Sequence, residues 1–147
     1  MAKKKSGCPC GGDRYETCCA PLHRGAVAAT AEALMRSRFT AFVKRDADYL
    51  WKTLHSQHEA RRQDEAEWKA ALLRDAPSYT SLRIVETAEP DGDGVARVLF
   101  VVRYRAKGRA RVAAELSFFA QEDAWRYIDG ILTDAASATS IAAVEGR

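Results

Sequence analysis

Residues 95–132 read VARVLFVVRYRAKGRARVAAELSFFAQEDAWRYIDGIL. Apolar and polar residues alternate along this stretch, which is typical of strands with one face in a core. The polar breaks at residues 107–109 and 122–123 predict hairpin turns. An earlier strand, residues 79–88, ends at the turn signal EPDGDG. The sequence therefore predicts an antiparallel sheet of about four strands.

The alternation also predicts which side chains share the inner face of the sheet. In the first long strand these are Val98, Phe100, Val102 and Tyr104. A three-residue loop at 107–109 would place Val112, Ala114, Leu116 and Phe118 on the same face. A two-residue turn at 122–123 would add Trp125, Tyr127 and Asp129. Asp129 would then be a carboxylate among aromatic and aliphatic side chains.

Helices are expected before the strands. Thr30, Asp46 and Asp64 are suited to cap the N-termini of helices over residues 31–45, 47–55 and 65–75. Helices followed by hairpin-linked strands favour an α+β fold. The tail, residues 134–147, is small and polar and is expected to be poorly ordered or weakly helical. Leu99 and Val101 would face outward and mark a contact in a homodimer; a monomer is the alternative.

The only four cysteines of the chain lie within residues 8–19, CPCGGDRYETCC. Disulfides fit this spacing poorly, because they would need a strained Cys18–Cys19 bridge or very short loops. Four thiolates can instead surround one zinc ion tetrahedrally, which leaves no open position for substrate. We therefore expect one structural zinc ion, with Cys8, Cys10, Cys18 and Cys19 as ligands. Lys3, Lys4, Lys5 and Arg14 would offset the negative charge of that site.

Two alternatives remain open for this cluster. His23 could replace Cys19 as the fourth ligand, which would keep the metal and change one position. Iron could occupy the site in place of zinc, because tetrathiolate sites accept both metals.

The spacing CPCGG…Y…CC resembles the SEC-C motif, best known from the tail of the preprotein translocase ATPase SecA, where it forms a zinc knuckle that binds other proteins. The loop between the second and third cysteines is one residue shorter here than in the usual motif. The segments LMRSRFTAFVKRDADYLWKTLH and ELSFFAQEDAWRYIDG, behind such a knuckle, resemble the YchJ-like family of small bacterial proteins. This resemblance covers roughly residues 8–132.

The resemblance implies a zinc knuckle joined to a nuclear-transport-factor-2-like cone. We place the knuckle at residues 1–24, the cone at 28–133 and the tail at 134–147. In such a cone, three helices lie on a curved antiparallel sheet. We expect the knuckle and the cone to fold independently, so that removal of the metal would leave the cone intact. The family resemblance implies no activity, and the cone fold itself hosts enzymes, ligand binders and adaptors.

A cone of this kind would enclose a pocket, in which polar groups could bind or act on a small ligand. We expect the pocket to be lined by Arg36, Arg38, Tyr49, His55, Phe118, Tyr127 and Asp129. His55 and Asp129 are the candidates for a general acid–base pair in a dehydratase or isomerase. The structural interpretations are an aspartate that fixes a turn in YIDG and a histidine that ends a helix, and these are preferred to catalysis.

The 147 residues are 47% hydrophobic and 29% charged, with a net charge of +3. Nucleic-acid binding is therefore a second and weaker alternative. It would use the knuckle together with Arg97, Arg103, Arg105, Lys107, Arg109 and Arg111. No apolar run approaches a membrane span of ~18 residues, and no apolar segment of a secretory signal follows the basic start. We expect a cytoplasmic zinc-binding adaptor whose knuckle docks onto another protein, and whose cone could hold a small ligand.

Overall fold

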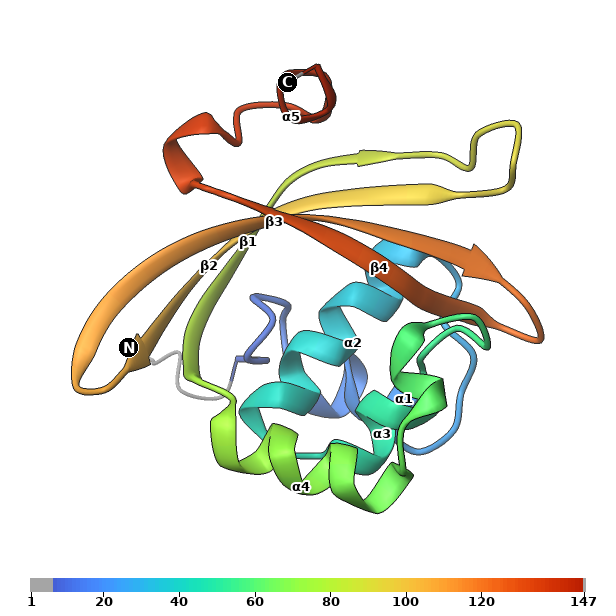
Figure 1. Cartoon of the computed structure of the whole chain (residues 1–147), viewed down its shortest axis with the longest axis vertical. Helices are drawn as coiled ribbons and strands as arrows, with labels where there is room; N and C mark the ends of the chain where they lie inside the picture. Colours follow the sequence, from blue (N-terminus) through green and yellow to red (C-terminus); the bar gives the residue numbers. More distant parts are fainter. Residues whose placement is uncertain (1–6, 147) are drawn as a thin grey trace.

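The computed structural model describes residues 7–146 and has the predicted α+β architecture. A four-stranded antiparallel sheet has the order β1 (Ser78–Ala88), β2 (Ala96–Ala106), β3 (Arg109–Gln121) and β4 (Trp125–Thr133). Helices cover its concave face, and the C-terminal segment lies on the other side of the sheet (Figure 1). The cone-like fold class is confirmed. Among the described residues, no helix is both long and apolar enough to cross a membrane.

Three of the four helices described before the sheet begin where the capping residues predict. The four are α1 (Ala20–His23), α2 (Ala31–Val43), α3 (Ala47–Lys52) and α4 (Glu65–Asp75), with short 3-10 turns at Tyr15–Thr17 and Glu59–Arg62. Thr30, Asp46 and Asp64 each accept a hydrogen bond from a backbone amide in the first turn of the helix that follows. These bonds satisfy amides that have no partner within the helix.

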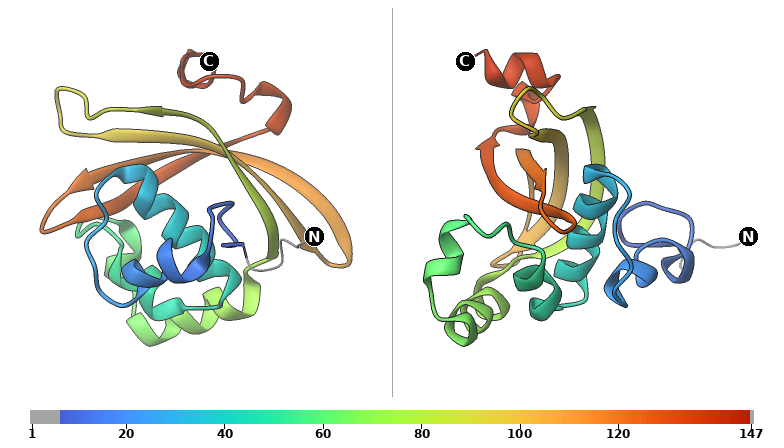
Figure 2. Two further views of the ribbon diagram at one scale, coloured as in Figure 1. Left: turned by 180° about the vertical axis from the view of Figure 1, so that it is seen from behind. Right: turned by 90° about the vertical axis from the view of Figure 1, so that its right-hand side faces the viewer.

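The main core lies between α2 and the concave face of the sheet. Leu34, Met35 and Phe39 from the helix pack with Val98 and Phe100 from β2. Cys8, Cys10 and Cys19 belong to the same buried cluster, because the N-terminal segment packs against α2 (Figure 2). The N-terminal knuckle and the cone therefore share one core.

The face prediction for β3 is wrong by one residue. Ala106 pairs with Arg109, so the hairpin loop has two residues, Lys107 and Gly108, both with positive φ. Such primed turns match the twist of the flanking strands. A shift of one residue reverses every side chain, so Glu115, and not Leu116, shares the face of Phe100.

A bulge between β3 and β4 corrects the prediction for Asp129. Trp125 and Tyr127 lie on the inner face as expected, and Tyr127 pairs with Phe119. Asp129, however, pairs with the adjacent residue Phe118, so one extra residue of β4 falls between the two pairs. The bulge turns Asp129 to the outer side, where it is exposed.

The C-terminal tail, described to residue 146, is partly helical, as the second of the two expected alternatives has it, and it packs against the sheet. A 3-10 turn (Ala135–Ser137) and helix α5 (Ile141–Glu145) lie on the convex face of the sheet (Figure 1). Ile141 and Val144 pack there in a second core cluster with Leu99, Val101 and Leu116. Leu99 and Val101 are covered within the chain, so the prediction that they mark a dimer contact is wrong.

This second cluster predicts that the tail stabilises the sheet. Replacing Ile141 with alanine should lower the free energy of unfolding by about 2 kcal/mol, because it leaves a cavity against Leu99 and Leu116. Urea denaturation measures the change, and Ala142→Ser at an exposed position of the same helix is the control. An unchanged midpoint for Ile141→Ala would show that the tail does not contribute to stability.

Candidate metal centre and cone cavity

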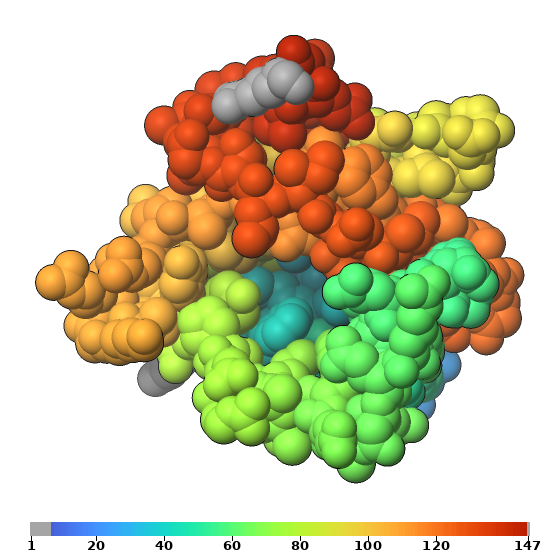
Figure 3. Space-filling model, in the orientation of Figure 1, coloured from blue at the N-terminus to red at the C-terminus, as the bar shows by residue number. Residues whose placement is uncertain are grey.

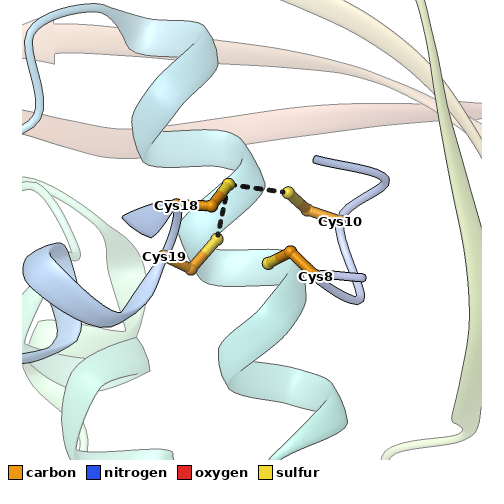
Figure 4. A group of neighbouring side chains, drawn as sticks. All are labelled: Cys8, Cys10, Cys18 and Cys19. Atoms are coloured by element: carbon orange, nitrogen blue, oxygen red, sulfur yellow. Dashed lines mark hydrogen bonds between the residues drawn. The ribbon is translucent and has the colours of Figure 1, made fainter. Parts of the chain in front are cut away.

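The four cysteine sulfur atoms form one compact cluster beside α2 (Figure 4). All four lie within 4.8 Å of one another. The Sγ atoms of Cys10 and Cys18 are 3.5 Å apart, and those of Cys18 and Cys19 are 3.9 Å apart. The cysteines carry no disulfide, and all but Cys18 are buried.

Backbone turns bring the first pair of cysteines to the second pair. The amide of Gly11 donates to the carbonyl of Cys8, which closes a turn around Pro9 and Cys10. Gly12 then passes directly over the sulfur atoms. A Cβ atom on Gly12 would lie 2.6 Å from the Sγ atom of Cys18, closer than real contacts allow. The glycine therefore makes the close approach of the loop possible.

Helix α2 supports the cluster with two polar side chains. The hydroxyl of Thr40 lies 3.3 Å from the Sγ atom of Cys19 and 3.6 Å from that of Cys8. The Nη1 atom of Arg36 donates to the carbonyl of Cys10 at 2.7 Å. Groups of this kind orient metal ligands and place positive charge beside thiolates. Lys3, Lys4 and Lys5, also expected to supply charge, lie outside the described residues.

The cluster fits a tetrahedral thiolate site. Four sulfur atoms at ~2.3 Å from one zinc ion are about 3.8 Å apart, close to the separations found here. The hydrogen bond with Cys19 lowers the pKa of Cys10 to about 4, whereas burial raises the pKa of Cys18. A bound cation would stabilise all four thiolates, so the cluster indicates a metal-binding site.

His23 has other partners in this structure. Its Nε2 atom donates to the carbonyl of Ser37 at 2.9 Å, which leaves Nδ1 to accept from the hydroxyl of Tyr15 at 2.9 Å. Both ring nitrogens are used, and the four sulfur atoms complete the cluster without the imidazole. The geometry therefore favours the four-cysteine set over the alternative with His23.

A cavity of about 410 Å³ lies between the helices and the sheet. Figure 3 shows its mouth, bordered by the α4 region and the sheet, with α2 at its floor. The apolar part of the lining includes Met35, Phe39, Phe42, Phe100, Val102 and Phe119.

A carboxylate from the sheet lies in the cavity wall. The Oε2 atom of Glu115 accepts hydrogen bonds from the hydroxyl of Tyr127 at 2.9 Å and from that of Ser117 at 2.5 Å. Burial, followed by the charge of Glu115, raises the pKa of Tyr127, so the phenol remains a donor. Gly130 makes room for this carboxylate, because a Cβ atom there would overlap the Oε2 atom of Glu115.

Arg38 and His58 complete the polar part of the wall. The Nη1 atom of Arg38 donates to the carbonyl of Leu50 and to the hydroxyl of Thr53. Burial lowers the pKa of Arg38 to about 10, so the guanidinium stays charged at neutral pH. Burial, together with the charge of Arg38, lowers the pKa of His58, whose imidazole is therefore neutral at pH 7.

The structure brings only part of the predicted pocket set together. Arg38 and Tyr127 line the cavity, and the Arg38 guanidinium carbon lies 4.7 Å from the centre of the Tyr127 ring. Arg36 reaches the cysteine loop, and the hydroxyl of Tyr49 bonds to Ser37 at 2.7 Å inside the helical layer. Phe118 packs in the cluster on the convex face.

The predicted acid–base pair has no place in the cavity. His55 does not line it: its Nδ1 atom accepts from the amide of Gln57, and its Nε2 atom lies 3.5 Å from Glu122. Asp129 is exposed and accepts a hydrogen bond from the amide of Gly130. The assignment of Asp129 to the inner face is therefore wrong, and the structural interpretation in which it fixes the local turn fits the contact.

Glu115, Ser117 and His58 line the cavity but were not predicted to do so from the sequence. Thr40 was likewise not predicted as a neighbour of the cysteines. The positions of Glu115 and Ser117 depend on the register set by the two-residue turn at Lys107 and Gly108. Lys107-Gly108 lies between two stretches in which apolar and polar residues alternate. A two-residue X-Gly pair in this position is a signal of a tight hairpin turn, as Asn-Gly is. Nothing in the local sequence distinguishes Thr40 from other helical threonines.

Comparisons with known proteins agree with the architecture. Residues 30–130 match the family model described as the YchJ middle NTF2-like domain. A UPF0225 protein of Ralstonia nicotianae is 39% identical over 138 residues, which cover 87% of this chain and 92% of that protein. A UPF0225 protein of Bordetella pertussis is 42% identical over 130 residues, covering 85% of this chain and 92% of the relative.

Two solved structures have the same fold. The solution structure of a SEC-C motif containing protein from Rhodopseudomonas palustris has a TM-score of 0.73 and 31% identity, and the match covers 87% of this chain and 99% of that chain. The crystal structure of a SEC-C motif containing protein from Psychrobacter arcticus has a TM-score of 0.70 at 24% identity, with 88% and 84% coverage.

The close approach of Gly12 to the sulfur atoms generates a prediction. Gly12→Ala should weaken binding of Zn²⁺ about tenfold or more, because the added Cβ atom displaces Cys18. Competition with a coloured chelator measures the affinity. Gly92→Ala is the matched control, since a Cβ atom there meets open space. Equal affinities for the two variants would contradict the described loop.

Proposed function

The chain belongs to the YchJ family, and from that premise we propose that it is a cytoplasmic adaptor in which one structural zinc ion shapes a protein-docking surface. The observation that carries this proposal is the compact cluster of four cysteine sulfur atoms, which packs against α2. The SEC-C motif named for the two solved relatives supports the same function.

A structural role for the zinc ion follows from its expected ligands. Four cysteines fill a tetrahedral shell and leave no position for water or substrate. Cys8, Cys10, Cys18 and Cys19 would hold the ion, and the hydroxyl of Thr40 would bond to one of the ligating sulfurs. The ion would supply a fixed crosslink between two short segments that bury little surface of their own.

The docking surface would be the loop between the two cysteine pairs. Gly11, Asp13, Arg14, Glu16 and Thr17 are all exposed. The loop projects from the side of α2 that faces away from the sheet (Figure 2). Because both its ends are cysteine ligands, metal binding would fix the shape that a partner protein meets.

Removal of the metal should destabilise the whole domain. The independence expected from the sequence does not fit the packing, because Cys8, Cys10 and Cys19 lie in the same core as Phe39 and Phe100. We expect protein purified without chelator to contain one zinc ion per chain, and chelation to lower the melting temperature by about 10 °C or more. Mass spectrometry and calorimetry measure the two quantities.

The matched control is Cys10→Ser, which removes one ligand. This variant should melt at the temperature of the chelated protein and should not respond to chelator. A wild-type protein that contains no zinc, or that melts at the same temperature with and without chelator, would contradict the proposal.

A crosslinking experiment tests the docking surface. A photoreactive phenylalanine at Arg14 should yield a discrete adduct in cells, and the adduct should disappear when Cys10→Ser is added. The same group at Asp93, an exposed position in the β1–β2 loop, is the control. Absence of an adduct from Arg14, or equal adducts from both positions, would argue against docking through the knuckle.

A further inference from the structure

The cone cavity is separate from the metal cluster and has no part in the docking function. Its volume of about 410 Å³ lies within the range of small-molecule sites. Aromatic and aliphatic side chains form most of its wall. Burying apolar surface against such a wall favours a ligand whose body is itself apolar.

Arg38 is a buried cation with unused hydrogen-bond donors. Only 8% of its surface is exposed, and Nη1 alone makes hydrogen bonds, both to neutral oxygens. Among residues 7–146, no carboxylate lies within ion-pair distance of Arg38, and neither its Nε nor its Nη2 atom makes a hydrogen bond. Arg38 lines the cavity, and its guanidinium carbon lies 4.7 Å from the centre of the Tyr127 ring in the same wall.

The carboxylate of Glu115 has more of its hydrogen-bonding capacity used within the chain than the guanidinium of Arg38 has. The Oε2 atom of Glu115 accepts two hydrogen bonds, from Tyr127 and Ser117. The face of the Tyr127 ring lies against the guanidinium, and the charge of Glu115 acts on it from across the wall, but no carboxylate lies within ion-pair distance of it. A buried guanidinium with free Nε–H and Nη2–H groups presents the fork that binds a carboxylate through two parallel hydrogen bonds.

We infer that the cavity binds a small, mainly apolar carboxylic acid, with the carboxylate on Arg38 and the apolar body against the aromatic wall. Phe39, Phe42, Phe100 and Phe119 would contact the body of the ligand. Glu115 would disfavour a second anionic group, which selects monocarboxylates. This inference does not depend on the zinc ion or on the docking function.

Three probes with one carbon skeleton test the inference: phenylpropanoate, phenylpropanol and phenylpropylammonium. Calorimetric titration of the full zinc-loaded chain compares their affinities. Phenylpropanoate should bind about tenfold or more tighter than the alcohol, because it gains charge-assisted hydrogen bonds, and the ammonium compound should bind most weakly. An alcohol that binds as tightly as the acid, an ammonium compound that binds best, or a protein that binds none of the three would overturn the inference.

Two variants assign the preference to the named residues. Arg38→Met should abolish the preference for the acid while the alcohol still binds, and Arg103→Met, at an exposed position of β2, should change nothing.

Glu115→Gln should tighten binding of phenylpropanoate, because it removes a like charge, and it leaves the contacts of Arg38 with α3 in place. Unchanged or weaker binding of the acid by Glu115→Gln would contradict the inference, even if Arg38→Met fails to fold.

Discussion

Helix α2 is buried on two sides, and this burial positions both the cysteine cluster and the cavity wall. One side packs against the sheet through Leu34, Met35 and Phe39, and the other side is covered by the cysteine loop. Polar side chains of the helix that are buried on either side need hydrogen-bond partners there. Thr40 therefore bonds to the cysteine sulfurs, and Ser37 bonds to Tyr49 and receives a bond from His23. A buried polar group without such a partner would cost about 1–3 kcal/mol.

The same helix links the metal cluster and the cavity. Thr40 contacts the cysteines, whereas Arg38, two residues earlier, lines the cavity. Residues two apart on a helix point in different directions, so one short segment serves both sites. No strand of the sheet carries a cysteine of the cluster, but the position of α2 on the sheet depends on what covers its outer side. The knuckle is in this sense part of the cone's core.

The sequence predicted the local features well, because their causes are local. The three helix caps and the cysteine spacing each depend on a few neighbouring residues, and Thr30, Asp46 and Asp64 cap their helices as expected. The inner face of the sheet was harder to predict, because it depends on turn length and on a bulge. One residue fewer in the 107–109 loop and one extra residue in β4 exchanged Asp129 for Glu115 in the cavity. In the tail, the capping residue Ser140 and the apolar pair Ile141 and Val144 indicate a short amphipathic helix. The surface that this helix covers could not be identified, because it consists of outward-facing side chains of β2 and β3.

X-ray absorption spectroscopy at the metal edge of the intact protein identifies the bound metal and its ligands together. We expect a zinc edge and four sulfur neighbours at ~2.3 Å, with no nitrogen or oxygen bound to the metal. This result would place Cys8, Cys10, Cys18 and Cys19 around one ion, as their packing against α2 indicates. A mixed shell with a nitrogen or oxygen ligand would contradict the closed four-cysteine site, and an iron edge would contradict the identity of the metal.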